Sequence, residues 1–287
     1  GGFAEVSGLA KLDYTGVADL TAAAGRTGTL LLDPNNVEIN TVSTIATASL
    51  ITPAAITTNL NTSAVVVQTG GSPTGVLIRD DGEVGDVFVK AALTYNSAND
   101  FAILAHRHVD FDASVQNSGT GGVTVVAGWD GTTGLTWASG IAAPELGFGF
   151  VNFGDIIDGV NHPNAYGNTS GTVYVGDGTQ TSGIVVGSRY GATNVAAFGL
   201  RLTGGNAGTR PYAQLGFRRD SGLSGFSING PITVALTGDL TATAGSSQHA
   251  YVQVGHGGGD FDGTGTNEPD GDFQGDRTIV QAQHLNF

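Results

Sequence analysis

Cysteine is absent from this sequence of 287 residues. Its absence excludes disulfide bonds, thiolate chemistry and zinc sites built on sulfur ligands. Methionine is absent as well, even at position 1, so we expect the sequence to be a processed or excerpted piece of a longer chain. A chain without either oxidisable residue suits an exposed, oxygenated environment.

Basic side chains are scarce. The sequence has 11 Lys and Arg against 25 Asp and Glu, a formal net charge of −14 at pH 7. A surface of that sign repels phosphate backbones and anionic lipids, so nucleic acids and membrane surfaces are disfavoured as partners. Long apolar runs and a recognisable signal peptide are also missing, so no membrane insertion is expected.

Glycine and alternating apolar residues are abundant. Gly supplies 47 residues without the period of three that collagen needs, and 40% of the chain is hydrophobic. The apolar residues fall in short alternating runs bounded by Gly, Asn, Asp, Ser and Thr, which is typical of strands joined by tight turns. Further along the chain this pattern predicts a set of separate strands: Val123–Ala127, Val173–Val175, Ile184–Val186, Leu200–Leu202, Ile232–Leu236 and Leu240–Ala244.

Two strand-sized segments near the end of the chain recur at a spacing of roughly 40 residues. The segment 212–217 (YAQLGF) returns at 251–256 (YVQVGH), and the segment 230–234 (GPITV) returns at 275–280 (GDRTIV). Repetition of such pieces is the mark of a fold that stacks similar units. The sequence therefore predicts an all-β parallel β-helix, or β-solenoid, with irregular inserted loops, as a single domain over residues 1–287.

The expected coil sets the expected size and ends of the molecule. At roughly 20 to 25 residues a coil and ~4.8 Å between coils, the chain would make about ten to twelve coils and a rod of about 50–60 Å. Neither end shows a charged, Pro-rich or helical cap, and residues 278–287 are themselves strand-like. Open sheet edges pair with matching edges, so copies of the chain are expected to stack end to end.

Some segments depart from the regular pattern. In residues 101–115 the odd positions are apolar and the even positions mostly polar, so the odd positions are expected to face the core and the even positions to face water. Arg107 falls on the apolar face, which predicts a bend there. Residues 41–69 carry weak helical as well as strand periodicity, and Pro53 limits any helix to a short one. Residues 129–168 form an aromatic, irregular or inserted region, and residues 257–276 an acidic Gly-rich loop.

The opening of the chain resembles a known family. The stretch from Val6 to Val37, with Thr29-Leu-Leu-Leu-Asp-Pro34, is similar to a recurring segment of filamentous-haemagglutinin-like exoproteins, as is His256-Gly-Gly258. The resemblance implies a bacterial right-handed parallel β-helix, downstream of a secretion domain, exported through an outer-membrane partner. It also implies an extracellular location, secreted or on the cell surface. The function implied is that of an adhesin or matrix component that contacts a host or neighbouring-cell surface or an extracellular polysaccharide.

Three groups of side chains are candidates for binding. His106, His108, Asp110 and Asp112 alternate along one strand, and two His at i and i+2 lie about 6.5–7 Å apart, a span that a transition metal can bridge. Solvated surface residues explain the same pattern. In the acidic loop, the Asp carboxylates supply the oxygen ligands that calcium prefers. A loop whose carboxylates are simply solvated is again the alternative. The four calcium candidates are Asp260, Asp262, Asp270 and Asp272.

Aromatic residues form the third group. Phe148, Phe150 and Phe153 would make an apolar contact for a ligand or a second subunit, or else fill an irregular coil. No cofactor other than calcium is expected.

An enzyme is the main alternative, because carbohydrate-active enzymes also use parallel β-helices. They gather acids and a base in one cleft, whereas here the only close Asp pairs beside an aromatic residue are Asp110 with Asp112 and Asp260 with Asp262. No Ser-His-Asp arrangement or phosphate-binding loop has supporting context. We therefore expect a structural or adhesive protein and no enzyme. A carbohydrate-active β-helix enzyme or a calcium-dependent carbohydrate-binding module is the alternative.

Overall fold

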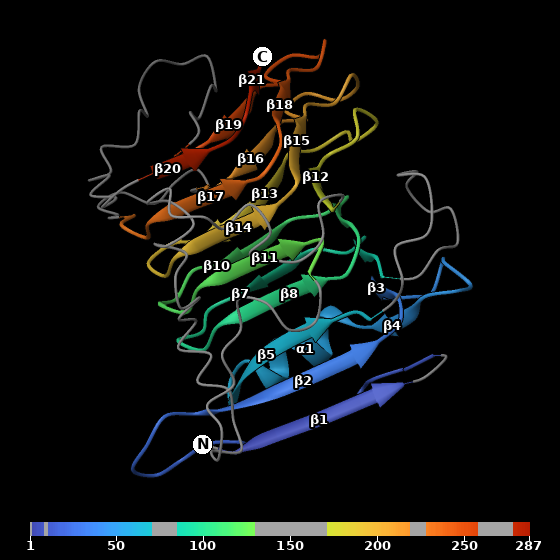
Figure 1. The fold of residues 1–287 in the computed structure, drawn as a ribbon, viewed down its shortest axis with the longest axis vertical. Coiled ribbons are helices and arrows are strands. Elements are labelled where there is room, and N and C mark those ends of the chain that lie inside the picture. The colour runs from blue at the N-terminus through green and yellow to red at the C-terminus, as the bar shows by residue number, and fades with distance from the viewer. Residues whose placement is uncertain (1, 9–10, 71–84, 130–170, 219–227, 258–277) are drawn as a thin grey trace.

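The computed structural model describes residues 2–8, 11–70, 85–129, 171–218, 228–257 and 278–287. Their strands stack into three sheets, rung upon rung, from one end of the molecule to the other (Figure 1). All the pairings between these strands are parallel. The chain is an all-β parallel β-helix, which confirms the predicted fold class.

Each sheet forms one side of the coil. Sheet A contains β1 (Phe3–Gly8), β2 (Gly28–Pro34), β5 (Ser63–Gln68), β8 (Phe101–Ala105), β11 (Val123–Ala127), β14 (Thr193–Ala197), β17 (Ile232–Leu236) and β20 (Thr278–Gln281). Sheet B contains β4 (Ser49–Ile51), β3 (Val37–Ile39), β6 (Val87–Val89), β9 (Val109–Phe111), β12 (Thr172–Val175), β15 (Gly199–Thr203), β18 (Leu240–Thr243) and β21 (Leu285–Asn286). Sheet C contains β7 (Leu93–Tyr95), β10 (Val115–Asn117), β13 (Ile184–Ser188), β16 (Ala213–Leu215) and β19 (Val252–Val254).

The coil is shorter than predicted because each turn uses more residues. The longest sheets have 8 strands in the described residues, which gives a rod of about 34 Å at the usual strand spacing. Val65, Phe101, Val123 and Thr193 occupy one column of sheet A, so the turns between them differ widely in length. The expectation of ten to twelve coils of 20 to 25 residues was wrong. Loops of unequal length leave the sheets without changing the spacing of the strands.

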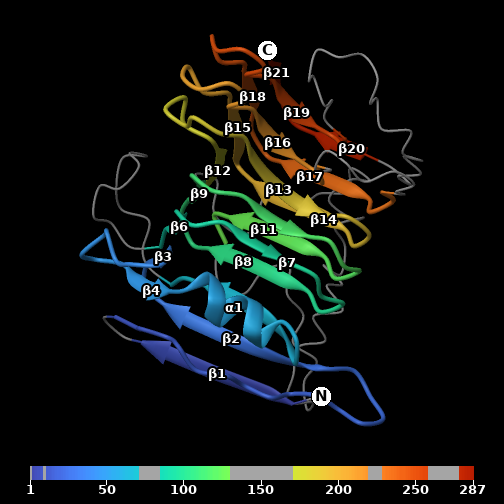
Figure 2. The same ribbon diagram turned by 180° about the vertical axis from the view of Figure 1, so that it is seen from behind.

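A single apolar column fills the inside of the coil. Alternate residues of each strand point inward, and in β8 these are Phe101, Ile103 and Ala105, all at most 1% exposed. The short helix α1 (Pro53–Asn59) contributes Ile56 to the same core. It contacts β5 and β7, and Thr52 caps it by accepting a hydrogen bond from the Ala55 N–H. In Figure 2 the helix lies on the side of the coil nearest the viewer. A short helix in residues 41–69 is thereby confirmed.

The outer face of sheet A is also apolar and buried. Ala102, Leu104 and Val126 pack with Trp129 in a second cluster outside the coil. The expectation that the even positions of residues 101–115 face water was therefore wrong for β8. The predicted bend is present, since β8 ends at Ala105 and β9 begins at Val109 in the next sheet.

The first repeat is confirmed and the second is displaced by one residue. Gln214 of β16 lies opposite Gln253 of β19, as the YAQLGF and YVQVGH segments predicted. In sheet A, however, Thr233 lies opposite Ile279 and not opposite Thr278. A shift of one residue exchanges the inner and outer faces of a strand, so the residues that enter the core decide the register.

Candidate functional site

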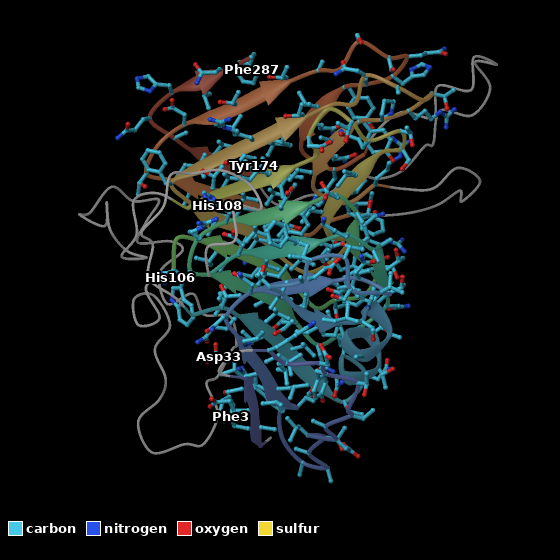
Figure 3. The ribbon with its side chains drawn as sticks, turned by 90° about the vertical axis from the view of Figure 1, so that its right-hand side faces the viewer. Phe3, Asp33, His106, His108, Tyr174 and Phe287 are labelled. Carbon is cyan, nitrogen blue, oxygen red and sulfur yellow. The ribbon has the colours of Figure 1, made fainter. Side chains whose placement is uncertain are left out.

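The two candidate metal-binding histidines lie at the corner between sheets A and B (Figure 3). The ring Nδ1 of His106 is 2.9 Å from the carbonyl oxygen of Trp129, whereas Nδ1 of His108 accepts a hydrogen bond from the N–H of Thr172. His108 is buried with its ring edge-on to Tyr174, at 5.8 Å between centroids. The Nδ1 atoms of the two imidazoles therefore contact backbone groups in different parts of the coil.

The metal hypothesis gains no support from this corner. Asp110, in β9, is buried, and Asp112 follows the end of that strand. In the part of the chain that the structure describes, no group of three or more His, Asp and Glu side chains is placed to hold a metal ion.

Arg107 occupies the bend as one half of a buried ion pair. Its Nε and one terminal nitrogen donate to the two carboxylate oxygens of Asp86, at 2.9 and 2.7 Å. The same carboxylate accepts from the backbone N–H of His108 at 3.0 Å. Arg107 is 1% exposed and Asp86 is 2% exposed. This ion pair links two neighbouring coils. Because both side chains are buried, neither is accessible to a ligand in solvent.

The remaining candidates lie outside the described residues. They are the calcium ligands Asp260, Asp262, Asp270 and Asp272 and the contact residues Phe148, Phe150 and Phe153. The same holds for most of the predicted irregular region 129–168 and of the acidic loop 257–276. Trp129 is the described residue that begins the former, and it is buried.

The most distinctive feature of the described chain is the C-terminal end of the coil. Sheets A and B continue to β20 and β21, but the last described strand of sheet C is β19. A cavity of about 250 Å³ opens at this end, where Leu285 is 55% exposed and Phe287 is 92% exposed. Its lining is almost entirely apolar and comes from all three sheets: Leu202, Leu240, Ala242, Val252, Gln253, Val254, Val280, Leu285 and Phe287.

One edge of β19 faces this cavity without a described strand beside it. The carbonyl oxygen of Tyr251 accepts from the N–H of Ala213, and the N–H of Gly255 donates to the carbonyl oxygen of Leu215. Backbone groups of alternate residues in a parallel strand point to opposite neighbours. Those of Val252 and Val254 therefore point away from β16, toward the place of a next strand.

On the outer face of sheet C, the rungs of β16 and β19 carry the same residue types. The rings of Tyr212 and Tyr251 are stacked at 4.9 Å with 9° between their planes. Arg218 lies over the ring of Tyr212, 4.1 Å from its centroid, and donates a 2.6 Å hydrogen bond to the Tyr251 hydroxyl. Burial raises the pKa of Tyr251, and the charge of Arg218 partly offsets that rise. Gln214 donates to the carbonyl oxygen of Gly255 in the next coil, at 2.9 Å.

Glycines bring the coils together on the same face. A Cβ atom added to Gly187 would lie 2.3 Å from the carbonyl oxygen of Gly216, and one added to Gly216 would lie 2.2 Å from that of Gly255. The column Tyr, Gln and Gly along sheet C therefore specifies how one coil sits on the next. Sequence reasoning found the repeat but not the cavity, because the cavity depends on which side of the coil ends first.

The N-terminal end of the described coil is formed by β1. Among the described strands it is the outermost one of sheet A, and it pairs with β2. Its Ala4 and Val6 are partly buried against the core, as is Leu20 of the following segment. Val17, in that segment, is 63% exposed. Figure 3 shows Phe3 and Phe287 at opposite ends of the rod.

No protein-family model, no curated protein and no solved structure matches this chain. The described residues include no helix with the length and hydropathy needed to cross a membrane. The geometry at the two ends of the coil is therefore the basis for a functional proposal.

Proposed function

We propose that this chain is an extracellular structural or adhesive protein, a surface adhesin or matrix component of the filamentous-haemagglutinin-like kind, whose coils continue from one copy to the next in fibres. The observation that carries the proposal is the apolar cavity beside the edge of β19, next to which the structure describes no further strand. An apolar core that reaches the surface beside such a strand edge favours the addition of further strands.

Three further features support a role based on shape. The core runs without interruption from β2 to β18, so the described rod is stiff. The acids Asp86 and Glu38, which are buried, are both held by hydrogen bonds within the fold and do not converge on a cleft. The net charge of −14 keeps the flanks of neighbouring rods apart while the ends remain apolar. An outer-membrane export partner, a cell-surface partner and a polysaccharide partner belong to the same proposal.

Negative-stain electron microscopy of the purified protein, with and without a chelator, tests this function. We expect long fibres of uniform width that persist in chelator. Leu285→Asp places a charge in the lining of the cavity and should shorten or abolish the fibres. Val42→Asp is the matched control, since Val42 is 62% exposed between β3 and β4 and lines no part of the cavity. Isolated short rods from the unaltered chain would contradict the proposal and favour a binding or enzymatic module.

A further inference from the structure

His256 uses both nitrogens of its imidazole ring to hold two other segments of the coil. The N–H of Phe217, two residues after β16, donates to Nδ1 at 2.9 Å. Nε2 lies 2.5 Å from the carbonyl oxygen of Gly230, two residues before β17. A backbone N–H can only donate and a carbonyl oxygen can only accept, so the proton of the neutral ring is on Nε2.

The backbone beside this ring is fixed by two glutamine side chains. Gln214 of β16 donates through its amide to the carbonyl oxygen of Gly255 at 2.9 Å. The amide of Gln253 donates to the carbonyl oxygen of His256 itself, also at 2.9 Å. The imidazole is therefore held in one position between the two segments that it contacts.

A second proton on the ring is incompatible with this arrangement. It enters at Nδ1, where the N–H of Phe217 already points, so two donors then face each other. The contact with Gly230 survives, because Nε2 keeps its proton. Protonation of the ring therefore breaks the bond to Phe217 in particular.

Burial lowers the pKa of His256, and the hydrogen bond to the Gly230 carbonyl offsets only part of that effect. The folded state therefore binds the second proton less tightly than the unfolded state does. The resulting stabilisation is complete above the ordinary histidine pKa of 6.5 and is lost as the pH falls through the lower pKa of the folded state.

The described segments that are bonded to the ring carry no carboxylate. Arg218 is the next residue after Phe217, and Tyr251 lies on the segment of the ring itself. Beyond Gly230, the carbonyl oxygen of Arg189 accepts from the Gly230 N–H at 3.1 Å. The charged side chains on these segments are therefore cations, and none of them stabilises a protonated ring.

From this geometry we infer that His256 is a pH-sensitive latch, which holds residues 217–218 in place when it is neutral and releases them when it is protonated. The release extends to the outer face of sheet C, because Arg218 donates to the Tyr251 hydroxyl and lies over the ring of Tyr212. At acid pH the Arg218 guanidinium leaves the two tyrosines, while the strands of the coil stay paired. This inference goes beyond the proposed function and holds whether or not the protein forms fibres.

Hydrogen exchange measured by mass spectrometry tests the latch in the intact chain. After correction for the intrinsic rate, peptides that contain Phe217 and Arg218 should exchange faster as the pH falls. The increase should be up to about tenfold for each pH unit below about 6.5, and should level off once the folded histidine is protonated. Peptides from β5 are the reference, because that strand contains no titratable side chain.

Two substitutions separate the latch from a general effect of pH. His256→Asn keeps an oxygen acceptor near the position of Nδ1 and does not titrate, so exchange at residues 217–218 should stay slow at every pH. His256→Ala removes the acceptor, so exchange there should be fast at every pH. An arginine-specific dicarbonyl reagent, used at one acid pH, should modify Arg218 faster in the unaltered chain than in His256→Asn.

The inference is overturned if exchange at residues 217–218 does not rise at acid pH in the unaltered chain, or if His256→Asn shows the same rise. Equal modification of Arg218 in the unaltered chain and in His256→Asn would overturn its release from the tyrosines. Both comparisons use the unaltered chain and His256→Asn alone, so they remain decisive even if His256→Ala fails to fold.

Discussion

Asp100 shows how burial at one residue shapes the stability of the coil. The carboxylate precedes β8 and accepts a hydrogen bond from the N–H of Gly122 in the next coil. Burial raises the pKa of Asp100 from 3.8 to about 6, and the Gly122 N–H offsets only part of that rise. The folded state therefore binds this proton more tightly than the unfolded state does. The stabilisation is complete below about pH 4 and is lost as the pH rises through about 6.

We expect Asp100→Asn to raise the free energy of unfolding at pH 7 by up to about 3 kcal/mol and to flatten its pH dependence between about pH 4 and 6. The amide oxygen can still accept from Gly122, so the contact between coils is kept. Urea denaturation across this pH range measures the effect. Asp19→Asn is the control, because Asp19 is exposed and its pKa is lowered by the Thr21 hydroxyl, so no gain at pH 7 is expected. A lower stability for Asp100→Asn at pH 7 would falsify the assigned burial effect.

At the same scale, the sequence predicted where a residue lies in the coil better than which residue it contacts. Arg107 on an apolar face correctly indicated the bend between β8 and β9. Its ion-pair partner Asp86 could not be predicted, because that partner belongs to the preceding coil and strand periodicity carries no information about what lies one coil away. The same reason explains why the alternation of His106 and His108 did not reveal their separate contacts with Trp129 and Thr172.

At the scale of the elements, the glycine column of sheet C sets how closely the coils approach. A Cβ on Gly187 would lie 2.3 Å from the carbonyl oxygen of Gly216, closer than van der Waals contact allows. We expect Gly187→Ala to lower the free energy of unfolding by about 1–3 kcal/mol, the usual cost of overpacking. The expected readouts are a lower midpoint in thermal unfolding and faster hydrogen exchange in β16.

Gly70→Ala provides the comparison for this substitution. No heavy atom of the described residues lies within 4 Å of a Cβ built on Gly70, so alanine there should be neutral or slightly stabilising. Equal destabilisation of both variants would show that loss of glycine as such matters, and not the contact between coils.

The strands themselves were the most predictable elements. Val123–Ala127 and Ile232–Leu236 begin and end where the alternating pattern indicated. The wet face expected for β8 was wrong because the outer face of sheet A carries its own apolar cluster with Trp129. Alternation reports the polarity of side chains in sequence. It does not report whether an outer face is covered.

At the scale of the whole molecule, the net charge opposes contact between the sides of two rods, whereas the apolar ends favour contact between rods end to end. The net charge of −14 repels rods lying side by side, whereas in the proposed fibre the ends would meet through the apolar side chains that line the cavity. Salt shortens the Debye length from about 30 Å at 0.01 M to about 3 Å at 1 M. We therefore expect single fibres at low salt and lateral bundles at high salt, with no loss of fibre length. Electron microscopy over this range measures both quantities, and fibres that dissociate in salt would argue for electrostatic rather than apolar end contacts.

The number of coils was the least predictable property at this scale. The regular pattern suggested a constant turn length, but loops of very different size separate the strands of one column, as between Val123 of β11 and Thr193 of β14. Such insertions cost little because they leave from the corners of the coil and the strand pairing is unaffected.

Among the described strands, sheet C ends at β19 whereas sheets A and B continue to β20 and β21, and this has a consequence for the periodicity of the proposed fibre. If each copy begins on the side where the previous copy stopped, neighbouring copies face different directions, and a given flank returns to the same direction only after three copies. Three copies span about 23 turns of the coil, or roughly 110 Å at the usual strand spacing. Any ligand held by one flank would then be displayed in three rows parallel to the fibre axis, so a single fibre could engage surfaces on all sides.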